Sequence, residues 1–227
     1  VNHNYLIEVL KKRECGDNFL NFVKCFLKGK SFIRFNGKYS RTLNIERGVP
    51  QGETLSPFLF ILAIDPLINS IQDDNSIIGA KVGEKSVKVM ACTDDLVLVT
   101  ENPLDIQKMM RLVKKYEKAS NAKLNEKKSQ ILSFGSQTVE YYGNISQCKR
   151  GENVRHIGFF FNREEIFNNN DEIIEKILIK LKILRNLYPN LTTRANIWKG
   201  YAISSLLYQS EVIVNEENQT RYFENLQ

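Results

Sequence analysis

The chain has 227 residues, of which 42% are hydrophobic and 26% are charged, and these proportions are ordinary for a globular protein. This length suits one large domain, or a domain with a smaller appendage. The net charge of +6 and the pI near 9.0 favour a polyanionic partner. Acidic residues separate the basic clusters, so we expect a focused basic cleft rather than a basic tail. The clusters are Lys11–Arg13, Lys24–Arg34, Lys123–Lys128 and Lys149–Arg155.

Composition also excludes some classes of protein. Cys15, Cys25, Cys92 and Cys148 form no Cys-x-x-Cys pair and have no histidines at zinc-ligand spacing, which predicts reduced thiols in an intracellular protein. No apolar run reaches the roughly 18 residues that a membrane span needs, and no signal peptide is recognisable. Because the first residue is Val1, we expect the chain to be a piece of a longer protein.

The first part of the chain predicts two helices and a hairpin. Apolar residues recur at helical spacing from Asn4 to Leu27, and Gly16-Asp17 divides them into two helices. The segment from Ser31 to Ile45 contains Asn36-Gly37 between apolar residues, the strongest short signal for a β-hairpin.

The next predicted helix begins at Ser56-Pro57, with Ser56 as N-cap and Pro57 as the first helical residue. From Phe58 to Ile64 it is apolar almost all round, so we expect it to be fully buried. A further amphipathic helix follows Asn102-Pro103. Its expected buried stripe is Ile106, Met109, Met110, Val113 and Tyr116.

The last third predicts two strands and then two helices. The strands are expected at Ser129–Phe134 and Val154–Phe161, and the helices at Ile173–Leu184 and Ala195–Tyr208. Between the strands and the helices, we expect residues 162–170 to form a polar hinge. The alternation lacks a strict βαβ rhythm, so we predict the α+β class, with an antiparallel sheet backed by helices on one side.

Two adjacent carboxylates, Asp94 and Asp95, lie between apolar β-branched runs within Val87–Val99. A tight hairpin between two buried strands would place both acids at its tip. Ionised carboxylates beside a hydrophobic sheet need a cationic partner, and hard divalent ions prefer oxygen ligands. The pattern therefore favours metal-assisted phosphoryl chemistry, whereas the dipeptide alone would also fit a solvated turn.

A second block, from Arg47 to Phe60, contains two glycines around a Pro-Gln pair, just before the predicted helix. Glycine lets a backbone approach a ligand closely, and a Gln amide both donates and accepts hydrogen bonds. Such a loop suits a base pair or a sugar; the structural alternative is an ordinary turn that leads into a helix.

Together these blocks resemble the reverse transcriptases of non-LTR (LINE-type) retrotransposons. Arg-Gly-x-x-Gln-Gly-x-x-x-Ser-Pro precedes the x-Asp-Asp hairpin, and Lys123-Leu-Asn-x-x-Lys-Ser and Arg155-His-Ile-Gly-Phe159 follow it in family order. The opening Val1–Leu6 resembles the end of the family's Phe-Asp block. Cys92 and Thr93 depart from the usual aromatic and alanine before the two aspartates.

The resemblance implies a reverse transcriptase palm over residues 1–161 and a partial helical thumb over 162–227. It implies an RNA-directed DNA polymerase that copies an RNA template onto a DNA primer from deoxynucleoside triphosphates, located in the nucleus. The implied metal ligands are Asp94 and Asp95, which would hold two Mg²⁺ ions. The other implied residues are Lys128 near the triphosphate; Arg47, Gln51, Gly52 and Ser56 at the template–nucleotide pair; and His156, Ile157 and Gly158 as the primer grip.

The family's first aspartate and its fingers would precede Val1, so we expect this chain alone to be inactive. Two alternatives stay open: a decayed remnant that at most binds nucleic acid, and a group II intron or retron-type reverse transcriptase. The segment Leu55–Phe60 and the lack of a Gly-Gly after Gln51 disfavour the intron type.

Overall fold

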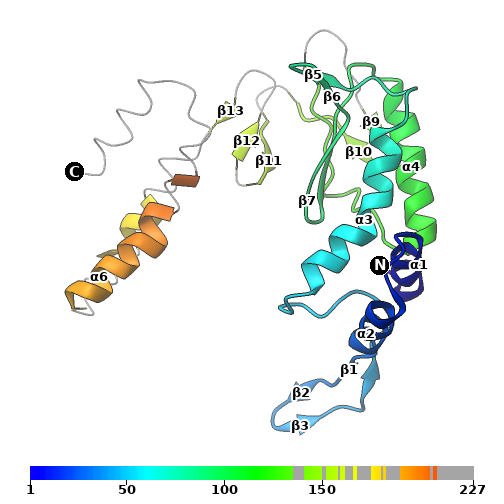
Figure 1. The fold of residues 1–227 in the computed structure, drawn as a ribbon. Helices are drawn as coiled ribbons and strands as arrows, with labels where there is room; N and C mark the ends of the chain where they lie inside the picture. Colours follow the sequence, from blue (N-terminus) through cyan, green and yellow to red (C-terminus); the bar gives the residue numbers. More distant parts are fainter. Residues whose placement is uncertain are drawn as a thin grey trace. The chain divides into compact units, whose positions relative to one another are not determined.

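The computed structural model describes residues 1–134, 141–149, 152–157, 159–161, 166–167, 175–179, 181–182, 190–204 and 207–208. It confirms the α+β class, with helices and short antiparallel strands (Figure 1). The chain divides into two compact units, Val1–Ser129 and Gln130–Gln227. The boundary between palm and thumb after residue 161 stays a prediction.

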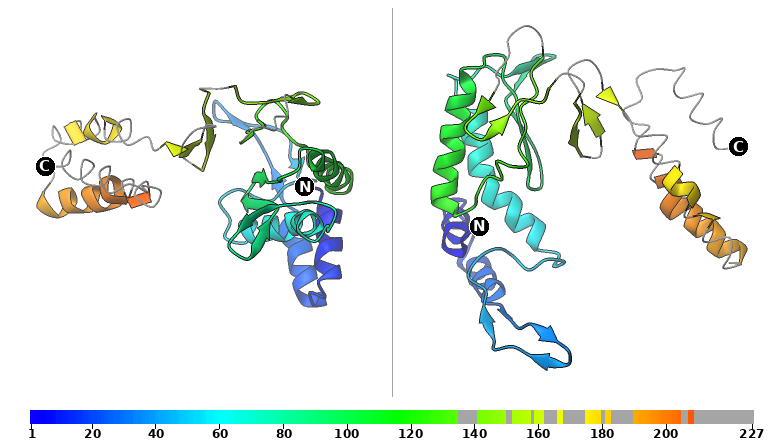
Figure 2. Two further views of the ribbon diagram at one scale, coloured as in Figure 1. Left: turned by 90° about the horizontal axis from the view of Figure 1, so that it is seen from above. Right: turned by 180° about the vertical axis from the view of Figure 1, so that it is seen from behind.

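Four helices build the first unit, and the views in Figures 1 and 2 agree that α3 and α4 run side by side. The predicted division at Gly16 is confirmed, because Gly16 is the N-cap of the second helix. The side-chain oxygen of Asn2 caps the first helix by accepting a hydrogen bond from the backbone N–H of Asn4. The helices are α1 (His3–Lys12), α2 (Asp17–Leu27), α3 (Ser56–Gln72) and α4 (Asp105–Ser120).

The core of this unit forms where the apolar stripes of α1, α2 and α3 meet. Leu10, Val23 and Leu59 are fully buried there. The predicted stripe of α4 is confirmed for Met109, Met110 and Val113, which are buried. Tyr5 and Tyr116 pack edge to face with ring centroids 5.8 Å apart, which joins α1 to α4.

Two expectations for α3 were wrong. Leu55 is the N-cap and Ser56 is already helical, so the helix begins one residue earlier than expected. The helix is not buried all round either, because Phe58 and Ile61 are 62% and 53% exposed while Leu59 and Ala63 are buried. The described residues supply packing partners for only one face of this helix, so an apolar sequence by itself did not define which face is covered.

The strands of the first unit pair as antiparallel hairpins. The predicted hairpin around Asn36-Gly37 is confirmed, and both turn residues have positive φ (51° and 78°), as in a type I′ turn. Its outer pair is β1 (Lys30–Ser31) with β4 (Leu43–Asn44), and its inner pair is β2 (Arg34–Phe35) with β3 (Lys38–Tyr39). Two further hairpins are β5 (Ala80–Val82) with β6 (Lys85–Val87), and β7 (Val89–Cys92) with β8 (Asp95–Leu98).

The second unit has short strands and helical segments. Its strands are β9 (Tyr141–Tyr142), β10 (Ile145–Ser146), β11 (Val154–His156), β12 (Phe159–Phe161) and β13 (Ile166–Phe167). The helix predicted over Ala195–Tyr208 begins earlier, at Leu191, and consists of α6 (Leu191–Ile197) continued by the π-helical segment η1 (Trp198–Ile203). Residues 175–179 and 181–182 are helical, and the rest of the helix predicted from Ile173 to Leu184 lies outside the described residues.

The predicted sheet differs from the one observed. Across the described ranges the strands form separate two-stranded hairpins and one three-stranded sheet, rather than one sheet backed by helices. The strand expected at Ser129–Phe134 is reduced to a single bridge between Ile131 and Gln147, and Val154–Phe161 is a hairpin rather than one strand. Short apolar runs do not specify their pairing partners, which accounts for both errors.

Candidate functional site

The two predicted metal ligands lie at the loop of the β7–β8 hairpin. Cys92 pairs with Asp95, so Thr93 and Asp94 form a two-residue loop and Asp95 is the first residue of β8. Both aspartates are exposed. The predicted hairpin with two neighbouring acids at its tip is therefore confirmed as local structure.

Thr93 has an unusual backbone conformation for its residue type, with a φ of 53°. The first position of a two-residue hairpin loop usually has positive φ with glycine there, as in a type II′ turn. A β-branched residue in this region costs of order 1–3 kcal/mol, and such strain concentrates at functional sites. The Thr93 hydroxyl donates a hydrogen bond of 3.0 Å to Oδ1 of Asp94, which orients that carboxylate.

The expectation that a buried environment forces a cation onto Asp94 and Asp95 is wrong. Met90, Ala91 and Cys92 are exposed, so the acids do not lie beside a buried strand and desolvation does not demand a cation. Within the part of the chain that the structure describes, neither Asp94 nor Asp95 is in an ion pair. Adjacent, unpaired carboxylate oxygens still suit a hard divalent ion. Among those residues there is no group of three or more Asp, Glu, His or Cys side chains that could hold a metal ion.

The base of the β7–β8 hairpin is anchored to α3 by a buried lysine that the sequence analysis missed. Lys88 is 7% exposed, and its Nζ donates to the backbone oxygens of Gln72 (2.8 Å) and Asp74 (3.0 Å). The backbone oxygen of Lys88 accepts from the N–H of Val99 at the far end of the return strand. A charged residue between Val87 and Val89 was the available signal, because lysine inside an apolar run requires polar partners.

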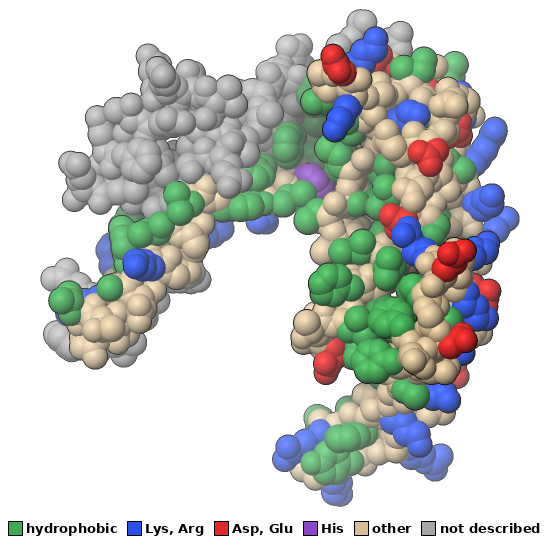
Figure 3. Space-filling model, viewed as in Figure 1, with side chains coloured by type: hydrophobic (Ala, Val, Ile, Leu, Met, Phe, Trp, Pro, Cys, Tyr) green, Lys and Arg blue, Asp and Glu red, His purple; other side chains and the backbone are tan. Residues whose placement is uncertain are grey.

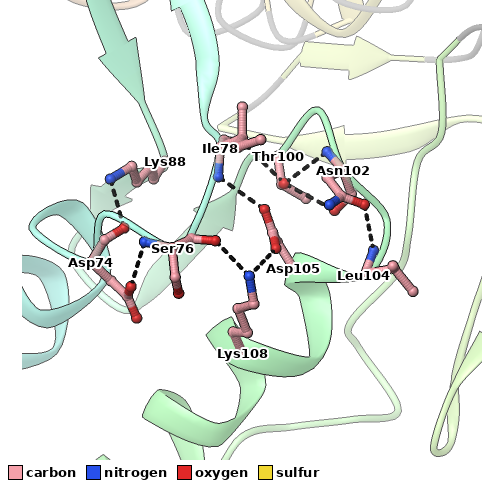
Figure 4. Close-up of polar contacts among 9 residues, drawn as sticks. All are labelled: Asp74, Ser76, Ile78, Lys88, Thr100, Asn102, Leu104, Asp105 and Lys108. Carbon is pink, nitrogen blue, oxygen red and sulfur yellow. Dashed lines mark hydrogen bonds and ion pairs between the residues drawn. The ribbon is translucent and has the colours of Figure 1, made fainter.

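The same network continues into the first turn of α4 (Figure 4). Asp105 is 1% exposed and accepts hydrogen bonds from the backbone N–H of Ile78 (2.9 Å) and from Nζ of Lys108 (2.7 Å). The Lys108 hydrogen bond, and secondly that of Ile78, lower the pKa of Asp105 below its ordinary value. Lys108 also donates to the backbone oxygen of Ser76. The base of the hairpin that carries the aspartates is thus bonded to the end of α3, and the segment that follows α3 is bonded to α4.

The Gln51-Gly52 loop is open to solvent, and its ends are anchored. Gly48 and Gly52 have positive φ (75° and 90°), which explains the two glycines of this block. The backbone N–H of Gly48 donates to the backbone oxygen of Val1, and Nε2 of His3 lies 2.8 Å from the backbone oxygen of Gly48. Gln51 and Gly52 are both exposed, so the amide is accessible to a ligand.

Ser56 is buried beneath the Gln51-Gly52 loop rather than exposed on it. It is 6% exposed, and its hydroxyl donates to the backbone oxygen of Pro50. Ser56 therefore holds the loop against the first turn of α3. Its predicted role at the template–nucleotide pair stays a prediction.

The two predicted cationic residues are accessible. Arg47 is exposed and forms an isolated bridge with Asn2. Lys128 is exposed in a turn, where its backbone N–H donates to the backbone oxygen of Asn125. In the described ranges, no hydrogen bond or ion pair joins Asp94 or Asp95 to Gln51 or Lys128; the connection runs through α3, which contacts β7.

The predicted primer-grip residues lie in the second unit, at the turn between β11 and β12. His156 pairs with Phe159. Ile157 has a φ of 48° and is, after Thr93, the second described β-branched residue with positive φ. The phenol of Tyr208 donates a 2.6 Å hydrogen bond to the backbone oxygen of Ile157. The Tyr208 and Phe159 ring centroids are 5.2 Å apart. The sequence offered no signal for Tyr208, and Gly158 lies outside the described residues.

An α+β chain with a carboxylate pair on a hairpin loop and a glycine-bearing loop before a helix fits the class of template-directed polymerases. The family described as reverse transcriptase (RNA-dependent DNA polymerase) matches residues 1–151. The chain belongs to this family.

Retrotransposon proteins are among its relatives. The Transposon TX1 uncharacterized 149 kDa protein of Xenopus laevis is 26% identical over 221 residues, which cover 95% of this chain and 16% of that protein. The Pol polyprotein from the type-1 retrotransposable element R2 of Popillia japonica is 32% identical over 174 residues, which cover 71% of this chain and 24% of that protein. The corresponding R2DM protein of Drosophila melanogaster is 26% identical over the same length and covers 71% and 16%.

These relatives confirm the resemblance to non-LTR retrotransposon reverse transcriptases. The chain spans between 16% and 24% of the length of the three relatives. Among the described residues, no helix is long and apolar enough to cross a membrane. The four cysteines are free thiols.

Proposed function

We propose that this chain provides the palm, residues 1–161, and the first part of the thumb, residues 162–227, of an RNA-directed DNA polymerase. The observation that carries the proposal is the Asp94-Asp95 pair on the loop of the β7–β8 hairpin, exposed and without an ion pair among the described residues. The hydrogen bond from the Thr93 hydroxyl to Asp94 and the anchoring by Lys88 support it, because both restrict the conformations of the loop.

In this proposal Asp94 and Asp95 hold Mg²⁺, together with a further family aspartate that this sequence does not contain. When bound, such ions lower the pKa of the attacking 3′-hydroxyl and hold the phosphate oxygens of the incoming nucleotide. Thr93 orients the carboxylate of Asp94 through its hydroxyl. Lys128 supplies positive charge to the triphosphate, which a flexible exposed ammonium group can do as a point charge.

Binding of the substrates falls to two other segments. Arg47, Gln51 and Gly52 contact the template–nucleotide pair, and the buried Ser56 keeps their loop in place. His156, Ile157 and Gly158 seat the primer end. The substrates are an RNA template, a DNA primer and deoxynucleoside triphosphates, and the site of action is the nucleus.

The test is primer extension on a primed RNA template with Mg²⁺ and deoxynucleotides. We expect no synthesis by the 227-residue chain alone, and synthesis by a version extended at its N-terminus to include the family's fingers and first-block aspartate. In that version Asp94→Asn is expected to abolish synthesis without a change in stability, because the substitution keeps the side-chain volume.

The chain contains its own matched control. Asp73-Asp74 is a second Asp-Asp dipeptide, at the C-terminal end of α3, and Asp73 is exposed. Asp73→Asn should leave synthesis unchanged. Retained synthesis by Asp94→Asn would refute the metal-ligand role, and synthesis by the 227-residue chain alone would refute the need for further ligands.

A further inference from the structure

The hairpin formed by β1 to β4 extends from the helices and packs against nothing that the structure describes. Every residue from Lys30 to Asn44 is exposed. The pairs β1–β4 and β2–β3 hold it, together with a hydrogen bond from the Ser40 N–H to the backbone oxygen of Ile33. Figure 1 shows it as a separate ribbon beyond α2. Its side chains are therefore not explained by packing within the first unit.

This hairpin belongs to a stretch of sequence without a single acidic residue, from Asn18 to Ile45. The stretch contains six basic residues, and all six are exposed. They are Lys24, Lys28, Lys30, Arg34, Lys38 and Arg41. A second stretch without acidic residues, from Lys176 to Ser210, also has six basic residues, but it is seven residues longer. Figure 3 shows blue and green side chains over the hairpin on the face drawn.

Aromatic side chains are interleaved with these cations. Phe32 and Tyr39 pack edge to face with ring centroids 5.0 Å apart, and the Arg34 guanidinium carbon lies 5.7 Å from the centroid of the Tyr39 ring. The two rings are 57% and 60% exposed. Phe35 is 80% exposed, and alternation along a strand directs it to the face opposite Arg34.

We infer that this hairpin, Lys30–Asn44, binds single-stranded nucleic acid, with bases stacked on Phe32 and Tyr39 on one face of the ribbon and on Phe35 on the other, and with phosphates paired with the flanking cations. Surfaces for single strands combine positive charge that follows the backbone with aromatic rings on which successive bases stack. In a duplex the base faces are covered by their neighbours, so the exposed rings would have no stacking partner. A protein partner fits less well, because lysine is depleted at the centre of protein–protein interfaces. None of these residues belongs to the candidate polymerase site.

Binding is best measured with a fluorescein-labelled 20-nucleotide oligo(U) and the 227-residue chain, by fluorescence anisotropy in EDTA without nucleotides. Phe35→Ala and Tyr39→Ala should each weaken binding by about 5-fold to 150-fold, the range for loss of one stacked base. Phe134→Ala is the matched control, because Phe134 is 66% exposed in the second unit, and it should leave the affinity unchanged.

The cations have a matched control in the β5–β6 hairpin. Lys30→Ala and Lys38→Ala should each lower the slope of log affinity against log salt by about 0.7, the value for one phosphate contact on a single strand. Lys81→Ala and Lys85→Ala change equally exposed lysines of another hairpin and should leave the slope unchanged. A 20-base-pair duplex of mixed sequence should bind more weakly than the single strand at the same salt.

The inference would be overturned if Phe35→Ala and Tyr39→Ala both bound oligo(U) within 2-fold of the parent chain. It would equally be overturned by a duplex that binds as tightly as the single strand. Misfolding cannot mimic the expected result undetected, since the far-ultraviolet circular dichroism and urea midpoint of each variant are compared with those of Phe134→Ala. The assay contains no divalent ion or nucleotide, so its outcome is independent of whether Asp94 and Asp95 support synthesis.

Discussion

Substitution of Asp105 tests how the segment that follows α3 is held on the first turn of α4. Asp105→Ala removes the acceptor of the Ile78 N–H and one half of the Lys108 ion pair. An unsatisfied, partly buried N–H costs about 1–3 kcal/mol. The ion pair contributes up to about 1 kcal/mol, since the Lys108 side chain is 40% exposed and screened by water. An acid in the first turn of α4 adds about 0.5 kcal/mol, so we expect a loss of about 2–4 kcal/mol in total.

Asp105→Asn separates hydrogen bonding from charge. The amide oxygen can still accept from Ile78, so we expect a loss of only about 1 kcal/mol. The assay is urea unfolding of the 227-residue chain, followed by far-ultraviolet circular dichroism. Asp17→Asn is the control, because Asp17 is an exposed acid in the first turn of α2, and it should change the free energy of unfolding by less than about 0.5 kcal/mol. Equal effects of Asp105→Ala and Asp17→Asn would refute the reasoning.

The difference in unfolding free energy between the parent chain and Asp105→Asn should depend on pH. The pKa of Asp105 is lowered from its ordinary value of 3.8, chiefly by the hydrogen bond from Lys108. A lowered pKa in the folded state means that the carboxylate contributes stability above pH 3.8 and loses it as the pH falls through the folded-state value. The difference in unfolding free energy between the parent and Asp105→Asn should therefore shrink below that pH. A constant difference would contradict the assigned cause.

Three other predictions concern packing and titration in the first unit. Gly79→Ala should lower the free energy of unfolding by about 1–3 kcal/mol in urea unfolding, because its Cβ would overlap the backbone oxygen of Val87. Gly29→Ala is the control, because its Cβ would meet only the Ile45 side chain, and it should change that free energy by less than about 1 kcal/mol. Leu59→Ala should cost about 2–5 kcal/mol and Phe58→Ala less than about 0.5 kcal/mol in the same measurement; equal losses would mean that α3 is covered on both faces. Burial raises the pKa of Tyr5 to about 12, so its contribution to stability should fall as the pH rises from about 10 to 12, and Tyr5→Phe should remove that part of the decline.

Local signals with a short range predicted much of this fold. Gly16 divides the first two helices, and Asn36-Gly37 turns the first hairpin, because both act through backbone conformations of their own neighbourhood. The Asp94-Asp95 loop also followed from the apolar runs beside it. The family resemblance rested on the order of such blocks, and it was confirmed over residues 1–151.

Features that depend on distant partners could not be predicted in the same way. The apolar sequence around Phe58 does not show which face of the helix packs against α1. The apolar residues of Ser129–Phe134 do not show which strand this segment pairs with. The hydrogen bond from Tyr208 to Ile157 joins residues 51 positions apart, which no periodicity records. Ser56 looked like a ligand contact because of its motif, whereas its burial emerges only in the folded unit.

The exposed hairpin from Lys30 to Asn44 also has a dynamic consequence. Two-stranded ribbons that pack on nothing are marginally stable in water, so this one opens locally at little cost in free energy while the surrounding helices stay closed. Its amide hydrogens should exchange with deuterium well before those of α1 or α3, and trypsin should cleave first after Lys30, Arg34, Lys38 or Arg41. A strand of nucleic acid lying across the ribbon would slow both processes there, giving a footprint of the bound ligand on the protein itself.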